Sequence, residues 1–260
     1  MLLTLNIGNT NIIIGVFHES KLITSWRIGT DLSKTEDEYA VVFHSLFKLR
    51  SVEVGEVTGA IISSVVPQLE LVMNRAIERV FGLTAEALDH QTVLPMRNLY
   101  EYPSEVGFDR LANAVGGKTL FGAPLIIVDF GTATTLDVIT REGDYAGGII
   151  LPGLEMSADA LYRRTSRLPQ IPIVKPARVL GTNTVSSMQS GLFYGSVGAI
   201  EGLIERLWRE MGYESKVVAT GGLAPLFSHE SRYISAPEPF LALYGLKSIW
   251  DQQPHSPHTG

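Results

Sequence analysis

Residues 125–135 combine the types of side chain that bind phosphate in proteins. An apolar run, Leu125 to Val128, leads directly into Asp129, Phe130, Gly131 and Thr132. Glycine lets a backbone approach an anion closely, and backbone N–H and threonine hydroxyl groups then donate to phosphate oxygens. A buried strand followed by an ordinary polar turn explains this stretch, taken alone, equally well.

A second copy of the pattern opens the chain and favours the phosphate interpretation. Residues 2–11 read LLTLNIGNTN, so that Asn6 aligns with Asp129 and Gly8 with Gly131. The sequence becomes apolar again after each turn, which predicts a strand, a tight turn and a returning strand in both copies. Two such turns can face each other across a cleft. A third glycine turn, at Gly221 and Gly222, also follows an apolar run.

A carboxylate and a guanidinium stand side by side in the sequence Gly107-Phe108-Asp109-Arg110. At a cleft, the aspartate can accept a proton from a substrate hydroxyl, and the arginine can bind an anion with two hydrogen bonds. A structural ion pair at the start of a helix accounts for the same residues equally well, and such a pair contributes little when it is exposed.

Other catalytic patterns are absent from the sequence. It contains no cysteine, no Gly-x-x-x-x-Gly-Lys-Ser/Thr loop and no Gly-x-Gly-x-x-Gly fingerprint. None of the six histidines has the spacing of a metal site, and no serine lies in a nucleophile elbow. A phosphate site here must therefore use backbone and hydroxyl donors, with a metal ion to neutralise charge.

Composition limits the class of protein. The formal charge of −6 argues against nonspecific binding of nucleic acid. No apolar run reaches the roughly 18 residues of a membrane span, and no basic segment precedes the first apolar residues. We therefore expect a soluble cytoplasmic protein without membrane or nucleic-acid partners.

The periodicity of apolar residues predicts the elements that position these motifs. Thr35 and Glu38 have the spacing of a capping box, Pro67 suits a first helical turn, and Gly82 suits a C-cap. Strands and helices alternate in the same order twice, which predicts an α/β protein of two similar halves. Strands are expected at 12–17, 22–28 and 58–66, helices at 36–50, 67–81, 154–163, 187–211 and 240–250, and long loops at 89–105 and 165–184.

One predicted helix has an unusual face. Gly191, Gly195, Gly198 and Gly202 recur at helical spacing within residues 187–211. Glycine thins that face and permits close packing against another element, so a dimer contact is one interpretation.

These motifs together resemble the type III pantothenate kinases, members of the acetate kinase, sugar kinase, Hsp70 and actin superfamily. The resemblance covers nearly the whole chain. It is carried by residues 8–11, 63–67, 107–110, 129–135, 147–148, 152–153, 220–222 and 241–246.

The resemblance implies an α/β fold of two duplicated ribonuclease-H-like domains, of the actin-like ATPase type, with a cleft between them. We expect an N-terminal domain at 1–115, a C-terminal domain at 116–250 and a disordered tail at 251–260. The resemblance also implies a homodimer.

The implied activity is ATP-dependent phosphorylation of pantothenate to 4′-phosphopantothenate, the first step of coenzyme A biosynthesis. It requires Mg²⁺ with the nucleotide and a monovalent cation, K⁺ or NH₄⁺. By resemblance, Asp109 is the general base and Asp129 is the ligand of the monovalent cation. The substrate contacts are Tyr100, Gly107, Phe108, Asp109, Arg110 and Thr184, and the nucleotide contacts are Asn6, Ile7, Gly8, Asn9, Thr10, Asn11, Ile12, Ile13, Thr132, Gly221 and Gly222.

The sequence departs from the family pattern at one position. The first phosphate motif of the family begins with aspartate, whereas this chain has Asn6. An asparagine offers an oxygen without charge, which weakens the orientation of water around Mg²⁺. Either the enzyme tolerates this change, or the chain is an impaired paralogue that binds ligands in a regulatory role. The intact motifs at Asp109 and Asp129 favour activity. A kinase or phosphatase of the same superfamily with another substrate is a further alternative.

Overall fold

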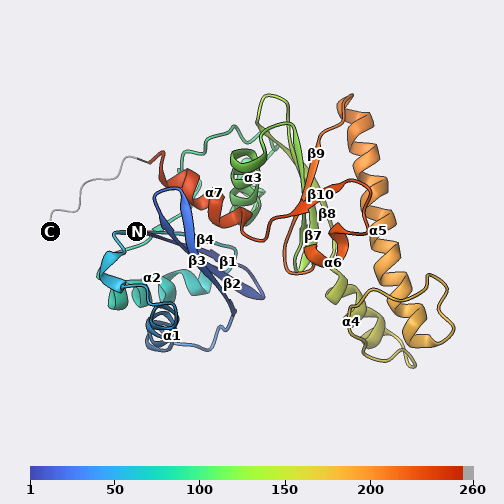
Figure 1. Ribbon diagram of the computed structural model, residues 1–260, viewed down its shortest axis with the longest axis horizontal. Coiled ribbons are helices and arrows are strands. Elements are labelled where there is room, and N and C mark those ends of the chain that lie inside the picture. The colour runs from blue at the N-terminus through green and yellow to red at the C-terminus, as the bar shows by residue number, and fades with distance from the viewer. Residues whose placement is uncertain (254–260) are drawn as a thin grey trace. The chain divides into compact units, whose positions relative to one another are not determined.

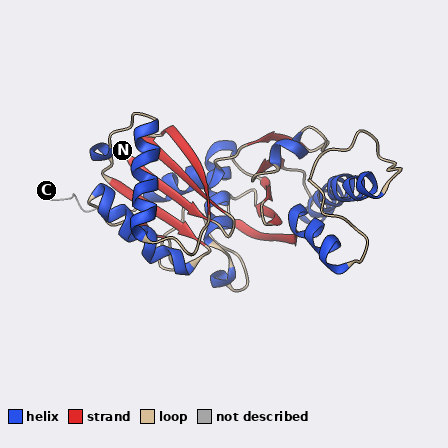
Figure 2. Ribbon diagram, turned by 90° about the horizontal axis from the view of Figure 1, so that it is seen from below, coloured by secondary structure: helices blue, strands red, loops and turns tan. Residues whose placement is uncertain are grey.

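The computed structural model describes residues 1–253, so most of the expected tail at 251–260 lies outside the described residues. The chain divides into two compact units (Figure 1). Unit 1 contains Met1–Leu120 together with the chain from Leu241 onward, and unit 2 contains Phe121–Phe240. Each unit is built around one mixed five-stranded sheet, whose strands are red in Figure 2.

The sheet of unit 1 has the strand order β3-β2-β1-β4-β5. The first three strands form an antiparallel meander, and β4 and β5 then add in parallel beside β1. The predicted strands are present, each within two residues of its expected ends. Their bounds are β1 Leu2–Ile7, β2 Asn11–His18, β3 Lys21–Gly29, β4 Gly59–Ser64 and β5 Glu86–Ala87.

The sheet of unit 2 repeats this arrangement, with the order β10-β9-β6-β7-β8. Its first three strands again form an antiparallel meander, and β9 and β10 add in parallel beside β6. The repeat extends to single residues: Asn6 is the fifth residue of β1, and Asp129 is the fifth residue of β6. The predicted duplication is therefore confirmed. The bounds are β6 Leu125–Phe130, β7 Ala133–Ile139, β8 Tyr145–Pro152, β9 Lys216–Thr220 and β10 Ile234–Pro237.

Helices α1 (Glu36–Leu49) and α2 (Pro67–Phe81) cover one face of the sheet in unit 1 and share its hydrophobic core. Their predicted ends are confirmed. The Thr35 side chain accepts the Glu38 N–H while Glu38 accepts the Thr35 N–H, which completes the capping box. Gly82 ends α2 in the left-handed conformation, at a φ of 69°.

The other face of this sheet carries α7 (Leu241–Trp250), which packs on β1, β2 and β4. Helix α7 also lies against α3 (Phe108–Phe121), beside it in Figure 1. A β-carbon at Gly116 would lie 1.9 Å from the Leu241 carbonyl oxygen, and one at Gly245 would lie 1.8 Å from that of Ala112. Only glycine permits this approach of the two backbones.

The units differ from the expected division at 115/116. The first boundary follows Leu120, because α3 continues to Phe121, and the last helix belongs to unit 1 rather than to the second half of the chain. The physical reason is the contact between α3 and α7, which joins segments far apart in sequence. Such a contact leaves no mark in local periodicity.

Unit 2 contains α4 (Leu154–Arg164), α5 (Thr184–Met211) and the short α6 (Ala224–Ser228). Helix α5 begins three residues before the expected start because Asn183 caps it: its side chain accepts the Ser186 N–H at 2.9 Å. Phe193 of α5 and Phe130 of β6 both stack on Phe227. Unit 1 also contains the 3₁₀ turns Val54–Glu56 and Pro103–Glu105. Among residues 1–253, no helix has the length and apolar character that crossing a membrane requires.

Candidate active site

The first predicted phosphate turn connects β1 to β2 in unit 1. The Gly8 N–H donates to the Asn11 carbonyl oxygen at 2.9 Å, which closes the turn. Thr30, just past the end of β3, holds it from the side. Its hydroxyl donates to the Gly8 oxygen at 2.6 Å, and its N–H donates to the Thr10 oxygen at 2.9 Å. These hydrogen bonds to its main chain fix the turn in place.

The end of β4 connects this turn to the segment that carries Asp109. The Val65 N–H donates to the Ile7 carbonyl oxygen at 3.0 Å. On its other side, the Val65 side chain lies 3.6 Å from the position that a β-carbon would take at Gly107. Unit 1 therefore brings together two groups of predicted site residues, the nucleotide turn at 6–13 and the substrate segment at 107–110.

Asp109 lies in the first turn of α3, where its carboxylate is oriented by the backbone. The Arg110 N–H donates to Asp109 Oδ1 at 2.8 Å. The carboxylate folds back over Gly107, because a β-carbon there would lie 2.6 Å from Asp109 Oδ1. Gly107 is therefore required by the placement of the carboxylate. The positive end of the helix dipole also favours its charged form.

Tyr100 lies in the expected long loop, which hydrogen bonds fasten to the rest of unit 1. Lys118 of α3 donates to the Pro95 oxygen at 2.9 Å. Near the end of the described chain, Gln253 donates to the Val93 oxygen at 3.0 Å. The Tyr100 N–H donates to the Asn98 side chain at 3.1 Å, so the backbone of the residue is held locally.

In unit 2, the second predicted phosphate turn lies beside Asp129. A β-carbon at Gly221 would lie 2.5 Å from Asp129 Oδ1, and Gly221 has a φ of 89°, which a larger residue adopts only with strain. Gly131 also borders the carboxylate, because a β-carbon there would lie 3.5 Å from Asp129 Oδ1. Two predicted nucleotide segments, the turn after β6 and the glycine turn after β9, therefore meet at Asp129.

Gly153 approaches the same turn from the start of α4. A β-carbon there would lie 2.1 Å from the Thr132 carbonyl oxygen, so only glycine fits. Thr184, predicted as a substrate contact, is the exposed first residue of α5. The predicted residues thus fall into two groups: Asn6–Ile13, Tyr100 and 107–110 in unit 1, and Asp129, Thr132, Thr184, Gly221 and Gly222 in unit 2.

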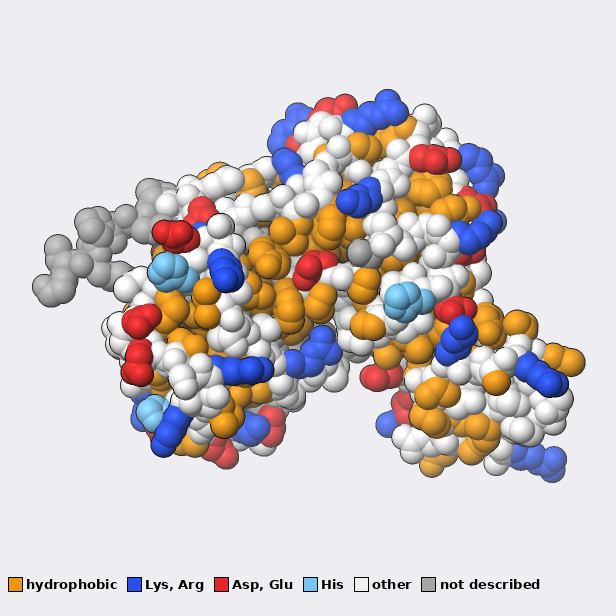
Figure 3. All heavy atoms as spheres, viewed as in Figure 1, with side chains coloured by type: hydrophobic (Ala, Val, Ile, Leu, Met, Phe, Trp, Pro, Cys, Tyr) orange, Lys and Arg blue, Asp and Glu red, His pale blue; other side chains and the backbone are white. Residues whose placement is uncertain are grey.

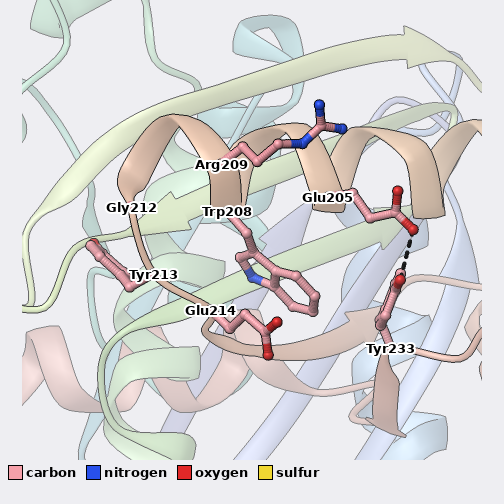
Figure 4. A pocket seen from close by; sticks show the side chains of 7 residues that line it. All are labelled: Glu205, Trp208, Arg209, Gly212, Tyr213, Glu214 and Tyr233. Atoms are coloured by element: carbon pink, nitrogen blue, oxygen red, sulfur yellow. Dashed lines mark hydrogen bonds between the residues drawn. The ribbon is translucent and has the colours of Figure 1, made fainter.

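A separate pocket of about 650 Å³ lies at the C-terminal end of α5 and contains none of the predicted site residues (Figure 4). Two of its polar side chains are joined by a hydrogen bond. The Tyr233 hydroxyl donates to Glu205 at 2.7 Å, and this hydrogen bond raises the pKa of the phenol. The lining residues are Glu205, Trp208, Arg209, Gly212, Tyr213, Glu214 and Tyr233.

The residues around the first turn can bind a hydrated Mg²⁺ only through the water molecules that the ion carries. Among the described residues, no three Asp, Glu, His or Cys side chains gather as a metal site. Residues 6–13 include no carboxylate. However, the Asn6 Oδ1 atom is buried and accepts no hydrogen bond. It is thus an acceptor available to a metal-bound water, since Mg²⁺ on phosphates usually retains several waters.

Comparison with known proteins places the chain in a family. A family model described as type III pantothenate kinase matches residues 2–206. A type III pantothenate kinase from Koribacter versatilis (strain Ellin345) is 45% identical over 262 residues, which cover 97% of this chain and 96% of the relative.

Solved structures agree at the level of the fold. A conserved protein assigned to the Baf family of transcriptional activators, from Campylobacter jejuni, superposes with a TM-score of 0.59 at 18% identity, covering 96% of this chain and 98% of that one. The activator of 2-hydroxyisocaproyl-CoA dehydratase from Clostridium difficile, with bound ADPNP, gives 0.52 at 10% identity over 98% and 99% of the two chains. With the family model matching most of its length and a relative at 45% identity, this chain belongs to the type III pantothenate kinases.

Proposed function

We propose that this chain transfers the γ-phosphoryl group of ATP to the hydroxyl of pantothenate, with Asp109 as the general base. Membership of the family carries the reaction. The observation that supports the base is the carboxylate of Asp109, held by the Arg110 N–H at 2.8 Å at the start of α3. A carboxylate in a fixed orientation can align a primary alcohol for attack and accept its proton.

The remaining roles are those that the family resemblance implies, and they draw on residues of both units. Tyr100, Gly107, Phe108, Arg110 and Thr184 contact pantothenate, and the Arg110 guanidinium suits its carboxylate. The turn at 6–13 and Thr132 hold the phosphates, while Gly221 and Gly222 border the adenosine. Bound Mg²⁺ neutralises charge on the phosphates. We assign Asp129 to the monovalent cation, K⁺ or NH₄⁺, because the family resemblance implies this role and its carboxylate lies where two predicted nucleotide segments meet.

Asn6 separates this proposal from the alternative of a ligand-binding paralogue. Thr30 holds the predicted phosphate turn, and Val65 lies between this turn and the Asp109 segment, which supports an arrangement suited to turnover. Phosphoryl transfer depends mostly on positioning and charge neutralisation, so loss of one carboxylate slows it without abolishing it. We therefore favour an active enzyme.

The test is release of ADP by the purified protein with ATP, Mg²⁺ and K⁺. We expect release that requires pantothenate and that falls when Na⁺ replaces K⁺. No release, with calorimetry still detecting bound nucleotide, would support the ligand-binding paralogue. Release without pantothenate would identify another acceptor, or water, and would overturn the proposed substrate.

We also propose a homodimer formed through α5. The four glycines of this helix recur on one face, and β-carbons at Gly191, Gly195 and Gly198 would meet no atom within 4 Å. Each helical glycine costs about 0.5–1 kcal/mol relative to alanine, so an unpartnered glycine face is unfavourable. A second copy of α5, approaching closely, gives the glycines a packing role.

Exposed apolar side chains near α5 support the same interface. Met156 and Tyr162 of α4 are 48% and 45% exposed, and Val179 and Leu180 before α5 are 65% and 79% exposed. Helix α4 packs on α5 within unit 2. Figure 3 shows hydrophobic side chains gathered on the part of unit 2 where Figure 1 places α4.

The glycine face gives a direct prediction. Gly195→Glu is expected to convert a dimer to a monomer, because the new side chain and its charge stand where the second helix must approach. Light scattering after size exclusion measures the mass. Gly55→Glu is the matched control, since Gly55 is another glycine whose β-carbon would meet no atom within 4 Å. A Gly195→Glu protein that remains dimeric, or a monomeric wild type, contradicts the proposed interface.

A further inference from the structure

Two buried side-chain oxygen atoms in unit 1 have no hydrogen-bond partner. They belong to residues that lie opposite each other on adjacent strands. They are Asn6 Oδ1 on β1 and Ser63 Oγ on β4. Asn6 pairs with Ser63 in the parallel register of these strands. Ser63 as a whole is 0% exposed. A buried polar group without a partner is costly, so a native protein that retains one usually has a use for it.

Both side chains lie on the same face of the sheet. Neighbouring residues Leu5, Ile7 and Ile62 belong to the core shared with α1 and α2. Because strand side chains alternate between faces, Asn6 and Ser63 lie on the opposite face. On that face a β-carbon at Gly59 would lie 2.5 Å from the Trp250 ring of α7.

The pair also lies at the end of the sheet where ligands bind. Strands β1 and β4 run in parallel and end at Ile7 and Ser64, one residue beyond Asn6 and Ser63. In open α/β sheets, ligands bind at the carboxyl ends of parallel strands. The phosphate turn follows β1 directly, and Val65 connects β4 to the Asp109 segment.

The chemistry of the two atoms defines what they can bind. Asn6 Oδ1 only accepts hydrogen bonds, whereas the Ser63 hydroxyl both donates and accepts. A single group that donates to Asn6 and exchanges a hydrogen bond with Ser63 satisfies both. A metal-bound water is such a group. Because neither side chain is charged, the pair is better suited to binding this water than to binding the bare Mg²⁺ ion.

We propose that Ser63 belongs to the nucleotide site: with Asn6 it receives a water of the hydrated Mg²⁺ that accompanies ATP. This inference rests on the proposed function and adds a residue to it. Ser63 then contributes to binding of the metal–nucleotide complex and contributes nothing to the stability of the ligand-free protein.

Ser63→Ala tests both statements in the full chain. Calorimetry is expected to show affinity for Mg²⁺·AMP-PNP reduced about 3- to 10-fold, as for loss of one hydrogen bond. Affinity for metal-free AMP-PNP should change less than about 2-fold, because no metal-bound water is then present to lose its hydrogen bond to Ser63. The ligand-free protein should unfold at the same temperature or a higher one, because the variant removes a buried unpaired hydroxyl. Ser63→Thr, which keeps the hydroxyl, should restore Mg²⁺·AMP-PNP binding.

Ser64 supplies the matched control. Its hydroxyl accepts the Val66 N–H at 3.0 Å and donates to the Val66 oxygen at 3.1 Å, so its hydrogen bonds are complete within the chain. Ser64→Ala should therefore lower the unfolding temperature and leave Mg²⁺·AMP-PNP affinity unchanged. The two neighbouring serines are predicted to give opposite results.

The outcomes separate this inference from the proposed function. A Ser63→Ala protein that unfolds earlier and binds Mg²⁺·AMP-PNP as tightly as wild type overturns the inference, as does an equal loss with metal-free nucleotide. If Ser63→Ala does not fold, Ser63→Cys keeps the volume and weakens the hydrogen bonds, with the same readouts. ADP release by the wild type, measured separately, decides whether pantothenate is the acceptor.

Discussion

Asp109→Asn is expected to lower kcat for pantothenate about 10²- to 10⁴-fold, the usual contribution of a general base. The amide cannot accept the proton of the alcohol. Its oxygen can still accept the Arg110 N–H, which donates to Asp109 Oδ1 at 2.8 Å. The local structure and the KM for pantothenate should therefore stay close to wild type. A coupled assay of ADP release, with circular dichroism to follow unfolding, measures these quantities.

Asp89→Asn is the control for this substitution. The Asp89 carboxylate also accepts a backbone N–H, that of Gln91 at 2.8 Å, and this hydrogen bond with those from Thr92 lowers the pKa of the carboxyl. Asp89 lies at the start of the long loop and has no assigned role in the chemistry. We expect Asp89→Asn to keep its kcat. Equal losses in the two variants would show that the effect at Asp109 is structural.

Asn6→Asp is expected to raise kcat/KM for Mg²⁺·ATP about 5- to 30-fold. Hydrogen bonds to a charged acceptor contribute about 1.5–3 kcal/mol, against about 0.5–1.5 for a neutral one, and each 1.4 kcal/mol is a factor of ten. Affinity for metal-free nucleotide should gain less than affinity for Mg²⁺·ATP, because without the metal the added carboxylate charge repels the phosphates. Steady-state kinetics and calorimetry with and without Mg²⁺ measure both effects.

The size of this gain decides between the two accounts of Asn6. A rise from measurable wild-type turnover indicates an active enzyme with a weakened metal contact. A rise from no detectable turnover would identify the natural chain as the ligand-binding paralogue. An unchanged rate in the Asp variant would show that position 6 does not limit phosphoryl transfer, and the role assigned to Asn6 would be withdrawn.

Much of the fold is determined by local signals that the sequence displays. The capping box at Thr35, the first-turn proline at Pro67 and the C-cap at Gly82 each act within one helical turn, so they are predictable from a few residues. The duplication is also visible, since Asn6 and Asp129 each follow an apolar residue at the fifth position of a six-residue strand. The family resemblance extended these signals to the proposed roles of the site residues.

Contacts between distant segments could not be predicted in this way. Helix α3 was not predicted because it is buried on most sides: Asn113, Val115 and Gly116 are all buried, which removes the usual alternation of polar and apolar faces. The steric need for Gly245 depends on Ala112, which only the folded chain brings near. Ser63 belonged to a motif of the resemblance, but its unpaired hydroxyl appears only when its surroundings are known.

The position of α7 has a consequence for how the protein is made. Unit 1 is encoded by both ends of the chain, whereas unit 2 is continuous from Phe121 to Phe240. During synthesis, the sheet of unit 1 is complete early, yet the face that contains Gly15 and Gly59 stays uncovered until the last helix leaves the ribosome. Domains otherwise tend to fold from the N-terminus as they emerge. A premature stop before Leu241 would therefore damage the first-made half of the protein and spare the half made last.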